Sequence, residues 1–268
     1  MTTTLHIGPW FGEFGWELMW HAFARREAKK YNRAVVGCFA GSEALYADFA
    51  DEFVTFGYTS QTQGARLRHC KPSQDLIDVI ESFRRRTHLP PRLVDPRISS
   101  VEWIPFGRPR DPAPADVVIH ARAIPAKGGD RNWPEERWDT LADLLVEKGV
   151  KVSAIGRGTA SYCPESAHDY RNEKLDYVMT MLANAKLIIG PSSGPIHLAA
   201  QCGTPTLCWT DFQHHGGGMT NYQRLKSVWN PFEVPVTLID GWQPSVQQVF
   251  GEAEAILAGD RPTDGHGG

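Results

Sequence analysis

The chain has 268 residues, enough for one large or two small domains with sizeable hydrophobic cores. Hydrophobic residues make up 41% and charged residues 22%, which is typical of soluble globular proteins. The formal net charge of -3 provides no overall basic field, so the composition argues against non-specific nucleic-acid binding and leaves room only for a local basic groove.

Cysteine usage and hydropathy predict a cytoplasmic protein. The five cysteines include no Cys-x-x-Cys pair, and Cys38, Cys202 and Cys208 lie in apolar segments, as reduced packing residues do. The N-terminus lacks a basic region followed by an apolar core, and no apolar run approaches membrane-spanning length. We therefore expect no membrane span.

The first half of the chain alternates short apolar runs with helical patterns. Strands are predicted at 4–7, 33–40 and 52–56, and helices at 16–31, 43–50 and 74–87. Ser42 is expected to cap the helix at 43–50. Residues 59–73 are polar and irregular, which makes them a candidate flexible or acceptor-facing segment. These patterns predict an N-terminal α/β domain over residues 1–110.

The second half alternates strands and helices more regularly. Strands are predicted at 116–120, 150–155, 186–190 and 204–209, helices at 134–148, 175–184, 195–201 and 244–258, and a loop at 156–172. This order is typical of a parallel sheet with helices on both faces. Residues 107–114 carry three prolines and predict an interdomain linker. The second domain is therefore expected at 115–243, followed by a C-terminal helix at 244–258 and a disordered tail at 259–268.

Residues 186–209 form the most informative unit, a strand, a helix and a second buried strand. The turn between the first strand and the helix is Pro-Ser-Ser-Gly-Pro, and Ser193 can cap the helix that begins at Gly194. The turn leaves small residues, hydroxyls and backbone N–H groups at a helix N-terminus. Such a site favours a phosphate or a diphosphate.

The same unit resembles the ADP-heptose:lipopolysaccharide heptosyltransferase family. Residues 193–200 read Ser-Gly-Pro-Ile-His-Leu-Ala-Ala, and Gly-Thr-Pro-Thr follows at 203–206. The family has an Asp where this chain has Ser192, and in the family this segment contacts the sugar nucleotide. The likeness extends back over 132–138 and 152–156, so that it covers about 116–209, whereas the N-terminal half matches in layout only. The resemblance implies a GT-B fold, with two Rossmann-like α/β domains whose parallel sheets face a central cleft.

Glycosyl transfer from a nucleotide sugar requires a stabilised diphosphate leaving group. Enzymes that use a metal for this purpose usually show an Asp-x-Asp pair, and this sequence contains none. We therefore expect a metal-independent site without a cofactor, in which a helix N-terminus and cationic side chains bind the nucleotide-diphosphate sugar. The candidate donor-binding residues are Arg122, Lys127, Arg131, Gly156, Ser192, Ser193, Gly194 and His197. His197 is included because it matches the family's Gly-Pro-x-His.

A carboxylate that deprotonates the acceptor hydroxyl is expected in the N-terminal loop. Glu13 and Glu17 flank Gly15, where the heptosyltransferases place a Gly-Asp pair that is thought to activate the acceptor. We favour Glu13 because it lies in the glycine-rich loop, whereas Glu17 already lies inside the predicted helix. The other acceptor-side candidates are Trp10, Phe11 and Gly12. The aromatic residues Trp10, Phe11 and Trp16 could form a platform for a sugar or a base, or could belong to the core.

No metal or hydrolase motif competes with this interpretation. His214 and His215 are adjacent, but no third ligand stands at metal spacing, so a loop over the donor site is the better interpretation of 214–218. The chain also lacks a Gly-x-Ser-x-Gly elbow, a Cys–His arrangement and a Walker loop.

The sequence thus predicts a metal-independent, inverting GT-B glycosyltransferase of the hexosyl or heptosyl type. Its acceptor is a glycan hydroxyl or a hydroxylated base in phage-type DNA, for which Arg66, Arg68 and the cluster at 84–86 would contact phosphates. Two alternatives stay open, a sugar-nucleotide 2-epimerase-like isomerase and a non-catalytic nucleotide-sugar binding module. The sequence contains no indication of oligomeric state.

Overall fold

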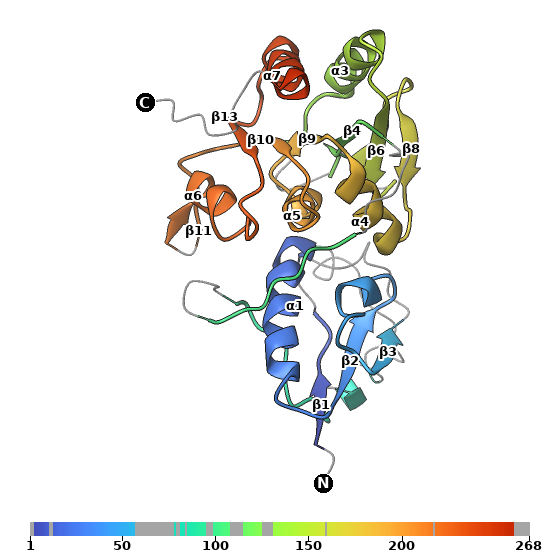
Figure 1. Cartoon of the computed structure of the whole chain (residues 1–268), viewed down its shortest axis with the longest axis vertical. Helices are drawn as coiled ribbons and strands as arrows, with labels where there is room; N and C mark the ends of the chain where they lie inside the picture. The colour runs from blue at the N-terminus through green and yellow to red at the C-terminus, as the bar shows by residue number, and fades with distance from the viewer. Residues whose placement is uncertain are drawn as a thin grey trace. The chain divides into compact units, whose positions relative to one another are not determined.

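The computed structural model describes residues 3–10, 13–56, 78, 81–83, 85–94, 99–107, 115–124, 131–158, 160–216 and 218–259. The chain forms two compact units, an N-terminal unit at Met1–Ile104 and a C-terminal unit at Pro105–Gly268 (Figure 1). Residues 108–114 of the predicted linker and residues 260–268 of the predicted tail lie outside the described residues. In the described part of the chain, no helix is both long enough and apolar enough to cross a membrane.

The N-terminal unit is built on a three-stranded parallel sheet. The strands β1 (Thr4–Ile7), β2 (Arg33–Phe39) and β3 (Glu52–Phe56) lie in the order β1-β2-β3, and α1 (Phe14–Ala28) forms the crossover from β1 to β2. The three predicted strands are confirmed, and the predicted helix begins two residues earlier and ends three residues earlier than expected. Aromatic side chains fill the core of this unit, with Phe56 between the rings of Phe39 and Phe83.

The predicted helix at 43–50 is wrong. Only a short 3-10 helix, η1 (Glu43–Leu45), forms there, followed by turns. Ser42 does not cap this element with its side chain, because its hydroxyl donates to Glu17 Oε2 at 3.4 Å in the interior. Tyr46 is likewise buried and donates to Glu17 Oε1 at 3.1 Å. Tertiary hydrogen bonds with a buried carboxyl group therefore override the local helix signal.

The C-terminal unit contains a six-stranded parallel sheet. Its strands are β4 (Val117–Ile119), β6 (Val152–Gly156), β8 (His168–Arg171), β9 (Leu187–Pro191), β10 (Thr206–Thr210) and β13 (Val236–Asp240). They lie in the order β13-β10-β9-β4-β6-β8. The strand order reverses between β4 and β9, as in doubly wound dinucleotide-binding folds, so ligands are expected beyond the carboxyl ends of these two strands.

Helices cover both faces of this sheet, as predicted (Figure 1). The helices α3 (Glu135–Glu147) and α7 (Val246–Ala258) pack together on one face, and α4 (Leu175–Asn184) and α5 (Gly194–Gln201) lie on the other. Under α3 and α7, the rings of Trp133, Trp138 and Trp209 lie with their centroids 4.9–5.5 Å apart. This aromatic cluster is part of the apolar core of the unit.

Several small elements of this unit differ from the sequence prediction. The predicted loop at 156–172 contains β8 and the short strand β7 (Ser161–Tyr162), which pairs antiparallel with β5 (Ala121–Arg122). Because β8 is an edge strand with polar, half-exposed side chains, its sequence lacks the apolar run that marks a buried strand. No element was predicted at β13 or at α6 (Asn221–Lys226), and β11 (His215–Gly216) pairs with β12 (Met219–Thr220) in a hairpin where a loop was expected.

Candidate functional site

The candidate site in the C-terminal unit lies where the order of the sheet reverses. The strands β4 and β9 stay hydrogen-bonded up to their ends, since the amide of His120 donates to the carbonyl of Ile189 at 3.0 Å. A Cβ atom on Gly190 would lie 3.0 Å from the carbonyl oxygen of His120, closer than most real Cβ contacts. Glycine at this position therefore avoids a tight contact between the ends of the two strands.

His120 links the end of β4 to the start of α5 through a side-chain hydrogen bond. Its Nδ1 lies 3.0 Å from the hydroxyl oxygen of Ser193, and the side chain is buried. Burial and, to a smaller degree, the positive charge of Arg122 lower the pKa of His120 to about 4. The ring is therefore neutral at physiological pH, and Ser193 donates to it when the ring proton is on Nε2. The imidazole fixes the direction of the hydroxyl at the start of α5.

Ser193 is the N-terminal cap residue of α5, as predicted, but its side chain makes no capping hydrogen bond. Its backbone is extended, with φ at -163° and ψ at 168°, and Gly194 and Pro195 follow as the first helical residues. The neighbouring Ser192 is anchored by its amide, which donates to the carbonyl of Trp209 at 3.0 Å. The structure thus brings Ser192, Ser193 and Gly194 together at a helix N-terminus whose positive end carries no side-chain cap.

His197 lies one turn into α5 and has cationic neighbours. Its ring stacks on Trp229 with centroids 3.9 Å apart, and its buried Nδ1 has no hydrogen-bond partner among the described residues. Burial, followed by the charges of Arg224 and Arg131, lowers the pKa of His197 to about 3. The imidazole is therefore neutral, and the two guanidinium groups bring positive charge to the first turns of α5. Arg131 also lies over the ring of Trp242 at 5.5 Å.

Arg122 is buried and holds a neighbouring loop in place. Its Nη1 donates to the side-chain oxygen of Asn132, and the Asn132 amide donates to the carbonyl of Ile124 at 2.8 Å. The guanidinium therefore supports the chain that follows β5 while its charge acts on His120. Lys127, which was predicted in the same loop, lies outside the described residues.

Gly156 ends β6 next to the same histidine. Its φ of 128° is a conformation that residues with a side chain rarely adopt. A Cβ atom there would lie 2.5 Å from Ser161 Oγ and 3.1 Å from His120 Cδ2. The ends of β4, β6 and β9 therefore converge on His120, with Gly156 on one side and Ser193 on the other.

Sequence reasoning missed three residues of this site. The same positional rule that selected Arg122 would have found His120, because His120 follows the apolar run of β4 directly. Arg224 and Trp229 come from α6 and the turn after it, where the sequence indicated no element. Only the tertiary structure brings these two residues to His197.

Glu13 stands at the N-terminus of α1 in the N-terminal unit. It is the cap residue of the helix, and its side chain is exposed and makes no capping hydrogen bond. Its carbonyl accepts from the indole of Trp10 and from the amide of Trp16, both at 3.0 Å. Trp10 is buried against Trp20 and so supports the loop from inside, while Trp16 is half-buried. Phe11 and Gly12 lie outside the described residues.

Glu17 occupies a different environment from Glu13. It is 1% exposed and accepts hydrogen bonds from Ser42 and Tyr46. Burial raises the pKa of Glu17 to about 8, although both hydrogen bonds oppose the shift. Its position in the core links α1 to the segment that follows β2.

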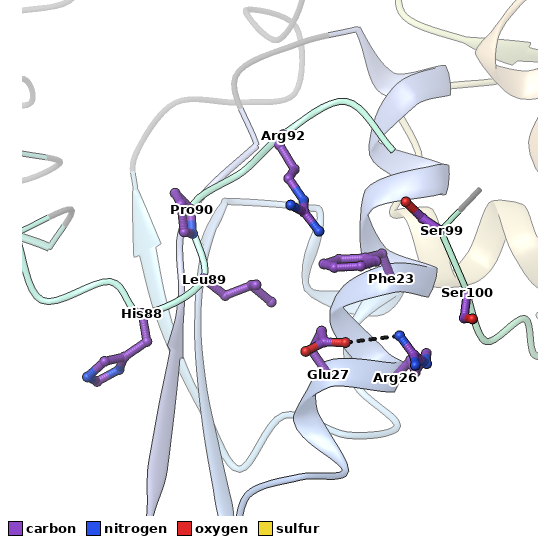
Figure 2. Close-up of a pocket in the computed structure, with 9 residues that line it drawn as sticks. All are labelled: Phe23, Arg26, Glu27, His88, Leu89, Pro90, Arg92, Ser99 and Ser100. Carbon is purple, nitrogen blue, oxygen red and sulfur yellow. Dashed lines mark hydrogen bonds and ion pairs between the residues drawn. The ribbon is translucent and has the colours of Figure 1, made fainter. Parts of the chain in front are cut away.

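A cavity of about 530 Å³ lies elsewhere in the N-terminal unit (Figure 2). Phe23, Arg26 and Glu27 of α1 line it on one side, and residues 88–90, 92, 99 and 100 line the rest. Arg92 lies over the ring of Phe23 at 4.6 Å, and Arg26 is paired with Glu27. None of the predicted site residues lines this cavity. It borders the last turns of α1, whereas Glu13 begins the helix.

The residues that the structure describes contain no group of three His, Cys, Asp or Glu side chains that could hold a metal ion. His214 is exposed, and residues 215–216 belong to the hairpin of β11 and β12. The predicted basic contacts at Arg66, Arg68 and Arg84 lie outside the described residues, and Arg85 and Arg86 are exposed.

The sequence model of glycosyltransferase family 9 (heptosyltransferase) matches residues 117–209. This segment contains β4, α5 and β10 together with His120 and Ser193, and it is the part of the chain on which the resemblance was predicted. That resemblance is confirmed. A comparison with curated proteins finds no match.

Solved structures of low sequence identity share the fold over nearly the whole chain. The glycosyl transferase family 9 protein from Veillonella parvula has a TM-score of 0.59 at 12% identity, with 96% of this chain and 98% of that one covered. Escherichia coli ADP-heptose lipopolysaccharide heptosyltransferase II has a TM-score of 0.60 at 15% identity, with 96% and 99% covered. The iron-containing dodecameric glycosyltransferase TibC from enterotoxigenic E. coli has a TM-score of 0.54 at 15% identity, with 97% and 77% covered. The predicted GT-B fold is confirmed.

Proposed function

We propose that this chain, which has the GT-B fold and matches glycosyltransferase family 9 over residues 117–209, is a metal-independent, inverting glycosyltransferase. It would move a sugar from a nucleotide-diphosphate donor to a hydroxyl group of an acceptor. The family match and the shared fold support glycosyltransferase activity in general. The assignments of residues below come from the geometry of the two units.

The observation that carries the proposal is the set of groups around the start of α5. Ser192, Ser193 and Gly194 place backbone amides at an uncapped helix N-terminus, where the helix dipole favours an anion. His197 lies in the same helix, and the charges of Arg131 and Arg224 act on it from other segments of the chain. These groups are suited to a diphosphate, whose negative charge grows as the bond to the sugar breaks. We assign them to the leaving group.

Glu13 is the residue we assign as the general base. Its carboxylate is exposed at the N-terminus of α1, where an acceptor can reach it, whereas Glu17 is enclosed by Ser42 and Tyr46. Glu13 takes the proton of the acceptor hydroxyl while the hydroxyl oxygen bonds to the anomeric carbon. The bond from that carbon to the diphosphate oxygen breaks, and the nucleoside diphosphate leaves with the electron pair. A single in-line displacement inverts the anomeric configuration.

Metal independence rests on the sequence. An Asp-x-Asp pair is absent from all 268 residues, and the cationic side chains near α5 supply positive charge for the diphosphate. The acceptor is proposed to be a glycan hydroxyl. Transfer to a hydroxylated base in DNA is the other outcome that an acceptor screen can return.

The test is turnover with a panel of nucleotide sugars and acceptors. We expect Glu13→Gln to reduce kcat at least about 100-fold, because a general base typically contributes 10²–10⁴, and to leave donor affinity unchanged. Glu135→Gln removes an exposed carboxylate from the first turn of α3 and is the matched control, with activity expected to stay at the wild-type level. Full activity of Glu13→Gln would remove Glu13 from the mechanism.

Two further readouts separate the finer parts of the proposal. Activity that disappears with a chelator and returns with a divalent cation would contradict metal independence, and a product with retained anomeric configuration would contradict inversion. Donor incubated alone is expected to stay unchanged. A new sugar nucleotide would instead indicate an isomerase, and donor binding without release of nucleoside diphosphate would indicate a binding module.

A further inference from the structure

Ser193 behaves differently from the other serine and threonine caps of the C-terminal unit. Thr220 caps α6 by accepting from the amide of Gln223 at 3.1 Å, and Ser245 caps α7 by accepting from the amide of Gln248 at 3.2 Å. Ser193 occupies the equivalent position of α5, yet its hydroxyl makes no such bond. Such a capping bond normally stabilises a helix, so its absence here needs a cause.

The Ser193 hydroxyl instead contacts His120, which directly follows the neighbouring strand β4. The Nδ1 of His120 lies 3.0 Å from Ser193 Oγ, and the ring is buried. Gly190 lies against the backbone and Cβ of His120, and the Cα of Gly156 faces the edge of its ring. Glycine at position 156 leaves the ring the space that a Cβ atom would occupy, and glycine at position 190 does the same for the backbone of His120.

A second observation comes from the same helix. His197, in the first turns of α5, has a buried Nδ1 without a hydrogen-bond partner among the described residues. A buried polar atom without a partner is costly in a protein that binds nothing there. The unfilled capping position and the unpaired nitrogen belong to the same short helix.

We propose that His120 is a positioning residue for the donor, which turns the Ser193 hydroxyl away from the helix and leaves the first amides of α5 open for the diphosphate of a nucleotide sugar. This inference rests on the proposed function. His120 acts through Ser193, and the helix N-terminus binds the phosphate oxygens. Without the imidazole, Ser193 would cap its own helix as Thr220 and Ser245 do, and the hydroxyl would compete with the ligand for the same amides.

The experiment measures binding of ADP and of UDP to the full chain by calorimetry, for wild type and four variants. His120→Asn places a hydrogen-bonding atom near the position of Nδ1, whereas His120→Gln places one near Nε2. We expect His120→Asn to bind within about threefold of wild type and His120→Gln to bind at least about tenfold more weakly. Ser193→Ala removes the hydroxyl but keeps the backbone amides of the helix start, and its measured affinity is the baseline for the double variant.

The deciding measurement is the double variant. If His120→Gln weakens binding because it releases the Ser193 hydroxyl, then Ser193→Ala in the same chain restores the affinity to that of Ser193→Ala alone. Thermal unfolding of each variant without ligand monitors folding. A histidine that only supports the fold would lower the unfolding temperature in both His120 variants and would show no rescue by Ser193→Ala.

The outcomes separate the inference from the proposed function. Wild-type protein that binds neither ADP nor UDP would overturn the donor site itself. Wild-type binding with equal affinities for His120→Asn and His120→Gln would overturn the role of His120 and leave the donor site standing. If His120→Gln does not fold, Ser193→Ala decides alone, because a loss of more than tenfold there would show that the hydroxyl itself binds the phosphate.

Discussion

His120 and Glu17 show how burial sets the charge of single residues in this protein. Both side chains are buried, and burial favours the neutral form of each. It lowers the pKa of His120 to about 4 and raises the pKa of Glu17 to about 8. The neutral histidine keeps an atom free to accept from Ser193. The neutral glutamic acid fits between Ser42 and Tyr46 without an uncompensated charge in the core.

Glu17 is expected to make the protein less stable as pH rises. The raised pKa means that the folded state holds a proton that the unfolded state releases above about pH 4.5, the ordinary value. The stabilisation from this bound proton is fully present below pH 4.5 and is lost between pH 4.5 and about pH 8. The free energy of unfolding falls by up to about 1.4 kcal/mol per pH unit in this range. Glu17→Gln should flatten that slope in denaturant unfolding from pH 5 to 8.

The exposed Glu135→Gln is the control for this measurement and is expected to reproduce the wild-type profile. A Glu17→Gln protein with the same pH dependence as wild type would show that Glu17 is ionised in the folded state.

At the scale of elements, the strand ends and the helix start decide what the C-terminal unit can bind. The strands β4, β6 and β9 end beside one another, and each contributes one part of the arrangement around His120. Gly156 is the part that tolerates least change, because it combines a φ of 128° with a close approach to Ser161 and His120. The site therefore depends on Gly156 and Gly190, which have no side chain that could contact a ligand.

Gly156→Ala is expected to destabilise the fold by about 2–4 kcal/mol, through backbone strain and overpacking against Ser161. It should also weaken nucleoside diphosphate binding, because the added methyl group displaces the His120 ring. Gly149→Ala is the matched control: Gly149 also has a positive φ, 78°, but open space around its Cβ position, so only about 1–2 kcal/mol of strain is expected. Chemical denaturation and calorimetry measure both effects. Equal losses for the two variants would contradict the close packing at Gly156.

At the scale of the whole molecule, the proposed chemistry is divided between the two units. Every described residue that we assign to the donor lies in Pro105–Gly268, and Glu13 lies in Met1–Ile104. The C-terminal unit has its own six-stranded sheet and a core centred on Trp133, Trp138 and Trp209. It therefore has what an independently folding domain requires.

A fragment of residues 105–268 is accordingly expected to fold alone and to bind nucleoside diphosphate within about tenfold of the full chain, but to transfer no sugar. Near-ultraviolet circular dichroism of the buried tryptophan cluster reports folding, calorimetry reports binding, and release of nucleoside diphosphate reports transfer. Acceptor-dependent transfer by the fragment would contradict the assignment of the base to Glu13.

The regular elements were predictable because their patterns are local. Apolar runs marked β2, β4 and β9, and Pro and Gly marked the ends of α3, so these elements follow from the sequence alone. The edge strand β8 was not predictable, because an edge needs few buried side chains. The helix predicted at 43–50 does not form, because tertiary contacts outweigh the local pattern there. The hydroxyls of Ser42 and Tyr46 donate to the buried Glu17.

The candidate site likewise has a part that was predictable from the sequence and a part that was not. The start of α5, with Ser192, Ser193 and Gly194, was predictable because the turn residues, the helix and the family resemblance all lie within one short segment. The direction of the Ser193 hydroxyl and the cations near His197 were not predictable, because they depend on contacts between distant segments. His120 is 73 residues from Ser193 in the chain, and a contact over that distance depends on the pairing of β4 with β9, which no local pattern encodes.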